Sequence, residues 1–294
     1  MRCDRCGRDA IIFQHYSGLH LCGDHLQRDL VTRAKRTIRA HGWIRSGDRI
    51  AVALSGGTNS SSLLHFFSAQ FGMRPDLSLV AITVDEGMGL PGDMNGIERL
   101  AEGMGIEWAG TSLAREFGKA LETENGPLPI FCRDILRASA LTSLAGRMGV
   151  TKVALGTTLD DGARSVLLSV LRGEPERLLG RPRPGEGEIP RIRPFLRIPA
   201  EEVALYARLN FPGDAGTAPR PQSRDPLWSE VRRVLSEYTN RHPAAPFSLV
   251  NLGDALQEQH VPGPVGPEPC DGCRERLATS CPARRIPGEV KGNG

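Results

Sequence analysis

Cysteine and histidine residues at the start of the chain have the types and the spacing of a metal site. Two residues separate Cys3 from Cys6, and two separate Cys22 from His25. Each short spacing puts two donors on one turn, and zinc suits a set of three thiolates and one imidazole. Because all four positions are filled, we predict a structural zinc ion that supplies folding energy to a short segment. The alternative is free thiols beside a surface histidine.

A second cysteine group near the C-terminus is less complete. Cys270, Cys273 and Cys281 offer three thiolates, but Arg284, three residues after the last, cannot bind a metal. A nearby histidine or carboxylate could supply a fourth donor, so a second zinc site stays open. Residues 258–270 are rich in Pro and Gly, which indicates a linker.

A glycine turn in the first half of the chain has the features of an anion site. Ser55-Gly56-Gly57 directly follows the apolar run 49–54, which is typical of a buried parallel strand, and a helical pattern begins at Ser60. A strand, a glycine turn and a helix in this order bring backbone N–H groups and a helix N-terminus to one point, which attracts an anion. We predict a nucleotide phosphate there; the alternative is a turn without a ligand.

Two further predicted strands end in polar residues. Asp85 follows the apolar run 77–84, and Gly156, Asp160 and Asp161 follow the run 152–155. Ligands of parallel sheets lie beyond the carboxyl ends of the strands, and carboxylates beside phosphates suit Mg²⁺. The sequence therefore predicts a nucleotide pocket at this edge. Alternatively, the two adjacent aspartates only cap a helix that starts near Gly162.

These patterns must be positioned by an α/β domain. Helical patterns at 96–104 and 135–148 alternate with the strands, which predicts a parallel sheet with helices on both faces. The 294 residues suffice for one large core and small appendages. We predict three parts: a zinc finger at 1–27, an ATP-binding domain at 28–258, and a linker with a degenerate C-terminal finger at 259–294.

The distribution of charged residues along the chain is more informative than the net charge. The net charge of +3 is too small to argue for nucleic-acid binding. After the first finger, an apolar face formed by Leu26, Leu30, Ala34 and Ile38 predicts a helix. The segment around this helix carries seven basic residues, which favour a phosphate backbone or simply form a solvated face: Arg28, Arg33, Lys35, Arg36, Arg39, Arg45 and Arg49.

The first residues and the cysteines predict the compartment. No secretory signal is visible, and no apolar run approaches the roughly 18 residues that span a bilayer. The paired cysteines favour metal binding over disulfides. We predict a cytoplasmic protein with no membrane partner.

Together these residues resemble the PP-loop ATP pyrophosphatases, specifically the tRNA 2-thiouridine synthetases and the cytosolic tRNA thiolation proteins. The resemblance covers the N-terminal finger, the glycine turn, Val84-Asp85-Glu86-Gly87, Leu159-Asp160-Asp161 and Pro190-Arg191-Ile192-Arg193-Pro194. It implies an adenine nucleotide alpha hydrolase-like fold that uses ATP and Mg²⁺ to adenylate a tRNA uridine before sulfur transfer. It places catalytic residues at Asp160, Asp161 and Cys132. It places ATP at Ala53, Leu54, Ser55, Gly56, Gly57, Thr58, Asn59, Ser60, Ile82, Val84, Asp85 and Gly156.

The chain departs from the family pattern at residues that the family uses for its reaction. The family loop reads Ser-Gly-Gly-Lys-Asp-Ser, whereas Thr58 and Asn59 stand here in place of Lys and Asp. The family also holds a [4Fe–4S] cluster on three cysteines, of which only Cys132 is matched, because Pro129 and Ala218 occupy the other positions. One thiolate cannot hold such a cluster, so the sequence argues against it and leaves Cys132 as a leftover thiol or a persulfide carrier.

Three functions stay open at this point. The first is an ATP-dependent tRNA thiolating enzyme, with tRNA bound along Arg28–Arg49 and with a sulfur-carrier protein and a second copy of the chain as candidate partners. The second is a catalytically impaired paralogue that binds a nucleotide, tRNA or a partner protein. The third is an adenylating enzyme for an acceptor other than tRNA.

Overall fold

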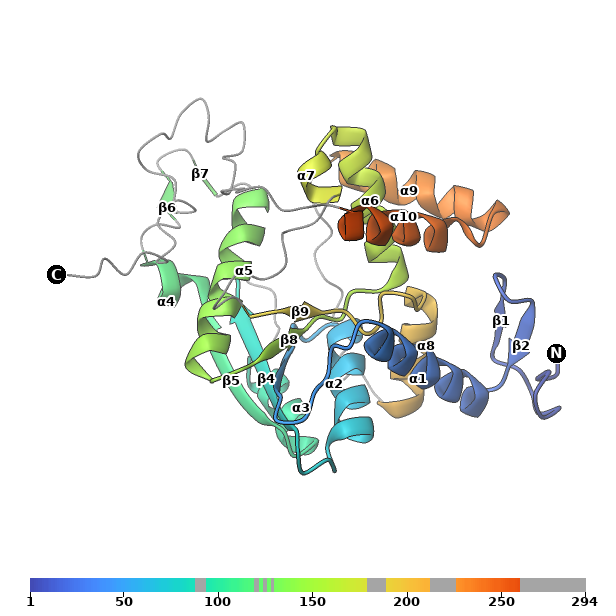
Figure 1. Cartoon of the computed structure of the whole chain (residues 1–294), viewed down its shortest axis with the longest axis horizontal. Helices are drawn as coiled ribbons and strands as arrows, with labels where there is room; N and C mark the ends of the chain where they lie inside the picture. Colours follow the sequence, from blue (N-terminus) through green and yellow to red (C-terminus); the bar gives the residue numbers. More distant parts are fainter. Residues whose placement is uncertain are drawn as a thin grey trace.

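Five strands pair side by side in one parallel sheet, as the computed structural model shows (Figure 1). The structure describes residues 1–87, 94–118, 122–123, 126–127, 130–178, 189–211 and 226–259. The order β5-β4-β3-β8-β9 places β3 at the centre. The predicted α/β fold with a parallel sheet is confirmed. The strands are β3 (Arg49–Ala53), β4 (Ser78–Asp85), β5 (Glu107–Ser112), β8 (Lys152–Ala154) and β9 (Arg191–Ile192).

The strand order reverses beside β3. The chain first adds β4 and β5 on one side, with Ala53 opposite Ile82. It then returns to the other side, where Val52 lies opposite Ala154 of β8. A reversal of this kind leaves a crevice outside the carboxyl ends of the two strands, where ligands of open α/β sheets bind. The glycine turn after β3 and Gly156 after β8 both lie there.

Helices cover both faces because side chains alternate along the strands. Ile50 and Val52 point to a large core shared with four helices, whereas Ala51 and Val153 point to a smaller core on the other face. All four side chains are at most 3% exposed. The larger core includes side chains from α1 (Gly23–Ala40), α2 (Thr58–Phe71), α3 (Met94–Gly103) and α8 (Ala200–Asn210), and the smaller core includes side chains from α5 (Ile130–Arg147).

The C-terminal helices form a separate cluster away from the sheet (Figure 1). Leu159 and Ala163 of the first helix pack with Leu235 and Val250 of the other two. The first of these helices begins earlier than the sequence suggested, because Thr158 rather than Gly162 precedes the first turn. The helices are α6 (Leu159–Arg172), α9 (Pro226–Arg241) and α10 (Ala245–Gln259), and the short α7 (Pro175–Leu178) follows α6.

The N-terminal segment forms a hairpin that leads into α1. Its strands are β1 (Ile12–Gln14) and β2 (Leu19–Leu21), which pair antiparallel. The apolar face predicted for the following helix is confirmed, since Leu26, Leu30 and Ala34 are completely buried. Three short elements complete the described chain: α4 (Leu113–Phe117), β6 (Glu122–Thr123) and β7 (Gly126–Pro127).

Some predictions concern residues outside the described part. These are the three C-terminal cysteines, together with Pro129 and Ala218; Cys132 belongs to α5, at a point where only the backbone path is described. Among the described helices, none is long and apolar enough to cross a membrane.

Candidate functional site

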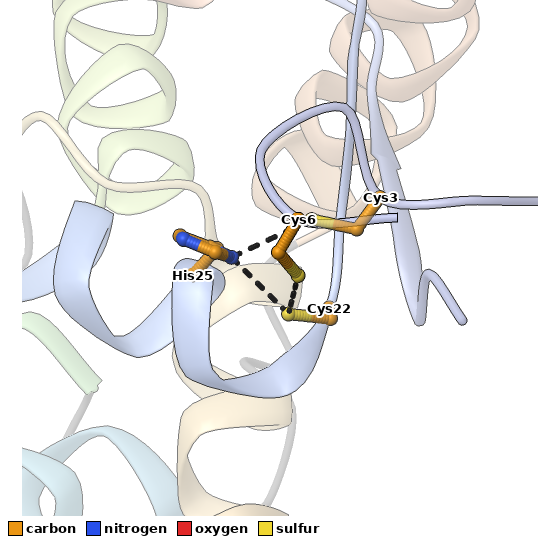
Figure 2. Close-up of side chains that lie close together, drawn as sticks. All are labelled: Cys3, Cys6, Cys22 and His25. Atoms are coloured by element: carbon orange, nitrogen blue, oxygen red, sulfur yellow. Dashed lines mark hydrogen bonds between the residues drawn. The ribbon is translucent and has the colours of Figure 1, made fainter. Parts of the chain in front are cut away.

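The four predicted zinc ligands meet at one point (Figure 2). Their donor atoms all lie within 4.8 Å of one another. Cys6 Sγ is 3.7 Å from Cys22 Sγ, and His25 Nδ1 is 3.3 Å from Cys22 Sγ and 3.6 Å from Cys3 Sγ. A tetrahedral zinc ion with Zn–S bonds of about 2.3 Å keeps its sulfur ligands about 3.8 Å apart. The geometry therefore fits a closed, structural metal site.

In the first turn of the finger, Arg8 stabilises the thiolate form of Cys6. The Arg8 guanidinium lies 3.4 Å from Cys6 Sγ and lowers the pKa of this thiol to about 7. A metal binds the thiolate form of cysteine, so a cation beside the sulfur prepares it for the ion. Arg8 also forms an ion pair with Asp24 at 2.6 Å, which ties the turn to the start of α1.

The glycine turn leaves an open helix N-terminus. Gly56 has a φ of 73°, and Gly57 precedes α2 without any side-chain cap. The first N–H groups of a helix have no acceptor inside the helix, so they point outward to bind an anion. Ser60 Oγ lies 3.1 Å from Ser55 Oγ, accepts a hydrogen bond from Ser55 N–H and donates one to Gly57 O, which holds the turn together from within. The turn fits a phosphate group.

The two residues that depart from the family loop stand at the head of α2. The side chains of Thr58 and Asn59 are half-buried, and neither makes a hydrogen bond within the described residues. Across the crevice, Gly156 lies directly against this turn: a Cβ there would be 2.9 Å from the carbonyl atoms of Asn59. The structure thus brings together the predicted residues of two strand ends.

The two adjacent aspartates have different partners. Asp160 Oδ2 accepts a hydrogen bond of 2.6 Å from Ala200 N–H at the start of α8. Asp160 Oδ1 has no hydrogen-bond partner in the described part of the chain. Asp161 accepts hydrogen bonds from the backbone and side chain of Thr158, at 3.0 and 2.8 Å, and so caps its own helix. Asp160 therefore has an oxygen available for a ligand, whereas Asp161 is engaged in capping α6.

Asp85 stands apart from this pair. It is exposed, and its Oδ1 accepts a hydrogen bond from Gly87 N–H at 2.9 Å. Within the described residues, it does not form one metal-ligand group with Asp160 and Asp161. The next residue, Glu86, forms an ion pair with Arg137 of α5 at 3.0 Å. This arginine stands one place after buried Leu136 and joins α5 to the end of β4.

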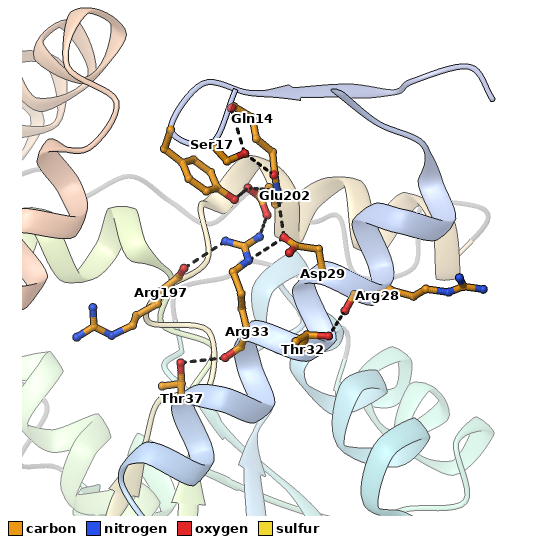
Figure 3. A network of polar contacts seen from close by, with 10 residues as sticks. Gln14, Ser17, Arg28, Asp29, Thr32, Arg33, Thr37, Arg197 and Glu202 are labelled. Atoms are coloured by element: carbon orange, nitrogen blue, oxygen red, sulfur yellow. Dashed lines mark hydrogen bonds and ion pairs between the residues drawn. The ribbon is translucent and has the colours of Figure 1, made fainter. Parts of the chain in front are cut away.

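A buried polar network divides the basic segment into two groups (Figure 3). Arg33 points inward, where it pairs with Asp29 at 2.9 Å and with Glu202 of α8. Arg49 pairs with Glu107 at 2.7 Å. Arg33 is therefore removed from the predicted phosphate track, whereas Arg49 stays at the surface with its charge already paired. The exposed arginines of the segment are Arg28, Arg36, Arg39 and Arg45, and Lys35 is half-buried.

Comparison with known proteins agrees with this geometry. Residues 26–217 match the family described as PP-loop domain. The chain belongs to the PP-loop family. Residues 2–27 match the N-terminal LIM domain of 2-thiouridine synthetase TtuA. This PP-loop protein is 29% identical to the tRNA 2-thiolation protein NcsA of Haloferax volcanii, over 95% of each chain. It is 31% identical to a tRNA-cytidine(32) 2-sulfurtransferase of an Anaeromyxobacter species, over 80% of this chain and 78% of that protein.

A solved structure corrects one expectation. The U34-tRNA thiolase NcsA of Methanococcus maripaludis has the same fold as this PP-loop protein, with a TM-score of 0.81, 24% identity and coverage of 89% of this chain and 88% of the other. That protein is described with its [4Fe–4S] cluster. This finding contradicts the expectation against a cluster, which we withdraw. That expectation rested on the number and the spacing of cysteines in the sequence. Spacing along the chain does not show which donors lie near Cys132 in the folded protein.

Sequence reasoning missed the residues that join the finger to this domain. Tyr16 and Glu202 form a hydrogen bond across 186 positions of the chain. No local pattern marks such a pair, because its partners come from separate elements.

Thr83 of β4 is a second residue that the sequence analysis did not single out. It gave a weak signal, as a polar residue inside an apolar run. Its hydroxyl donates to Leu54 O at 2.8 Å and accepts from Trp108 Nε1 at 3.1 Å.

Proposed function

We propose that this PP-loop protein is an ATP-dependent tRNA thiolating enzyme. The observation that carries the proposal is the uncapped glycine turn at Ser55–Gly57, which stands at the strand reversal opposite Gly156. An anion site at this position suits the phosphates of ATP. Similarity over 95% of the chain to a tRNA 2-thiolation protein supports this function over that of a catalytically impaired paralogue.

The reaction has two steps. A carbonyl oxygen of a tRNA uridine attacks the α-phosphorus of ATP, which forms an oxygen–phosphorus bond and releases pyrophosphate. A sulfur nucleophile such as hydrosulfide then adds to the activated carbon, AMP leaves with the former carbonyl oxygen, and the sulfur loses its proton. Both steps depend on positioning and on neutralising charge around the phosphate.

The residues of the crevice divide this work. N–H groups from Gly56 to Ser60 hold the phosphates, and the backbone at Ala53, Leu54, Ile82 and Val84 holds adenine. The Oδ1 atom of Asp160 is available to a ligand, because Oδ2 accepts the hydrogen bond from Ala200 N–H. Mg²⁺ would bind between phosphate oxygens and the carboxylate of Asp160, since this ion prefers oxygen ligands and retains several waters.

Other parts of the chain serve the tRNA and the sulfur. The exposed arginines of α1 offer contacts to a phosphate backbone, and the N-terminal finger would hold zinc at its four donors. Cys132 would carry sulfur as a persulfide or ligate a cofactor. The division at residues 27 and 258, a C-terminal zinc site, a sulfur-carrier protein and a homodimer stay predictions.

The decisive experiment measures both steps with protein purified without oxygen. The protein is incubated with ATP, unmodified tRNA and sulfide, and pyrophosphate and 2-thiouridine are quantified. We expect pyrophosphate release that depends on tRNA, and a fall of about 100-fold or more in Asp160→Asn. Asp9→Asn is the matched control, because this aspartate is exposed on the finger. A wild-type protein that forms neither product would refute the proposal, and release without tRNA would indicate another acceptor.

A further inference from the structure

Residues 197–202 contact the Asp160 carboxylate on one side and the N-terminal finger on the other. On one side, Leu159 N–H donates to Ile198 O at 2.9 Å, and Ala200 N–H donates to Asp160 at 2.6 Å. These two bonds cross between the same segments in opposite directions. The first turn of α8 and the first turn of α6 are therefore joined by two hydrogen bonds.

The other side of the same segment contacts the N-terminal finger (Figure 3). Glu202 is 1% exposed and accepts hydrogen bonds from Tyr16 OH at 2.6 Å and from Gln14 Nε2 at 3.2 Å. Arg33 pairs with the same carboxylate and donates to Arg197 O at 3.4 Å. Burial raises the pKa of Glu202, so each of these donors matters to keep the carboxylate ionised in place.

Only Glu201 separates the residue that binds the finger from the residue that binds Asp160. Both belong to one helical turn, whose backbone is rigid on this scale. Because one oxygen of Asp160 is fixed by Ala200 N–H, the position of this turn sets where the other oxygen points. A displacement of about 1 Å in a catalytic group is enough to slow a reaction strongly.

We propose that Tyr16 is a positioning residue for Asp160, acting through Glu202 and the first turn of α8. The finger then contributes to the chemistry of the crevice as well as to its own metal site. The inference rests on the proposed role of Asp160. The finger would then help to position Asp160, in addition to any contact that it makes with RNA.

The test compares Tyr16→Phe with Tyr238→Phe in the full-length protein. The first substitution removes the hydroxyl that binds Glu202 and keeps the ring, which contacts Phe247. The second removes a hydroxyl from a tyrosine that is 48% exposed on α9. Amide hydrogen exchange is measured by mass spectrometry over peptides from α8 and, as an internal reference, from β4. Metal content is measured in all samples.

We expect Tyr16→Phe to retain its metal and to exchange about three- to tenfold faster in the first turn of α8, with β4 unchanged. The kcat for pyrophosphate release should fall about three- to tenfold, with KM for ATP changed less than about twofold. Tyr238→Phe should match the wild type. Glu202→Gln should increase exchange in the same turn by more than Tyr16→Phe does, because it also removes the charge that pairs with Arg33.

Two results would overturn the proposal. One is a Tyr16→Phe protein whose exchange in α8 and whose kcat equal those of Tyr238→Phe. The other is faster exchange spread evenly over α8 and β4, which would mean general loosening. A wild type without pyrophosphate release would refute the proposed function alone, because the exchange measurements would still report on the connection between the finger and α8.

Discussion

Gly156 lies so close to Asn59 that any side chain at position 156 requires the backbone to shift. A Cβ at position 156 would be 2.9 Å from the carbonyl carbon and oxygen of Asn59 and 3.0 Å from the nitrogen of Ser60. The end of β8 therefore supports the first turn of α2 from below the predicted phosphate site. Gly156 follows β8 and Asn59 lies in the first turn of α2, so their contact joins the two sides of the crevice.

Gly156→Ala should disturb this contact and weaken ATP binding. The methyl group meets backbone atoms rather than a flexible side chain, so the head of α2 must shift. We expect the affinity for ATP, measured by calorimetry, to fall about tenfold or more, with a loss of about 1–3 kcal/mol in the free energy of unfolding. Gly146→Ala is the control, because a Cβ there meets no atom within 4 Å. Equal affinities in the two variants would contradict the prediction.

His25→Ala should remove the metal of the finger. Three thiolates remain, but the closed tetrahedral set is lost, and metal-binding energy is folding energy for such a short segment. Elemental analysis should find about one zinc per chain fewer in the variant than in the wild type, with a lower Tm. His41→Ala is the control, since this exposed histidine lies at the end of α1, where it contacts Thr37 O and stacks on Trp43. Full zinc content in His25→Ala would exclude this ligand set.

The exposed face of α1 should bind tRNA through its charge. Substituting Arg36 and Arg39 together by Gln removes two cations that have no carboxylate partner in the described part of the chain. If both contact phosphates, tRNA affinity falls, and the slope of log K against log salt decreases by about 1 for each contact. The control is Arg74→Gln, since Arg74 forms an ion pair with Asp76 before β4. Filter binding at several salt concentrations measures the effect; an unchanged slope would place the tRNA elsewhere.

The head of α2 should accept the residues that the family has there. Thr58 and Asn59 are half-buried and make no hydrogen bond within the described residues, so Thr58→Lys with Asn59→Asp meets little resistance. The lysine adds a charge beside the phosphates, and the carboxylate adds a ligand for Mg²⁺. We expect pyrophosphate release to rise about tenfold or more. A decrease would mean that this chain has adapted its crevice to the present residues.

Asp48→Asn should make the protein less stable in a pH-dependent manner. Burial raises the pKa of Asp48, but hydrogen bonds from Lys152, Arg45 N–H and Thr151 outweigh it and hold the pKa below its ordinary value of 3.8. A lowered pKa contributes stability above the ordinary value, and this contribution is lost as the pH falls through the folded-state pKa.

Denaturant unfolding at several pH values tests this expectation. At pH 7 the variant should be less stable by about 1–3 kcal/mol, because Lys152 loses its partner. The difference from the wild type should shrink below about pH 4. Asp9→Asn, at an exposed carboxylate, should match the wild type throughout. A difference that is constant with pH would show that the charge of Asp48 is not the cause.

The sequence by itself determined the fold class and the four candidate donors of the finger. Apolar runs of the right length predicted β3, β4 and β8, and the cysteine spacing predicted four donors that do meet. These features are local, because a strand or a metal-binding turn is specified by residues that are neighbours in the chain. The strand β5 was not predicted. Its residues, Glu107–Ser112, include several polar side chains, and only Thr111 among them is buried, so the segment has no continuous apolar run.

Only the tertiary structure decided what the charged residues do. Arg33 belongs to the same basic segment as Arg36, yet it pairs with buried Glu202, which is 169 positions away. Asp160 and Asp161 are neighbours, but one binds the start of α8 and the other caps its own helix. A charged side chain in water costs nothing, whereas a buried one needs partners from whichever element folds against it. That choice depends on packing between distant segments, which spacing along the chain does not record.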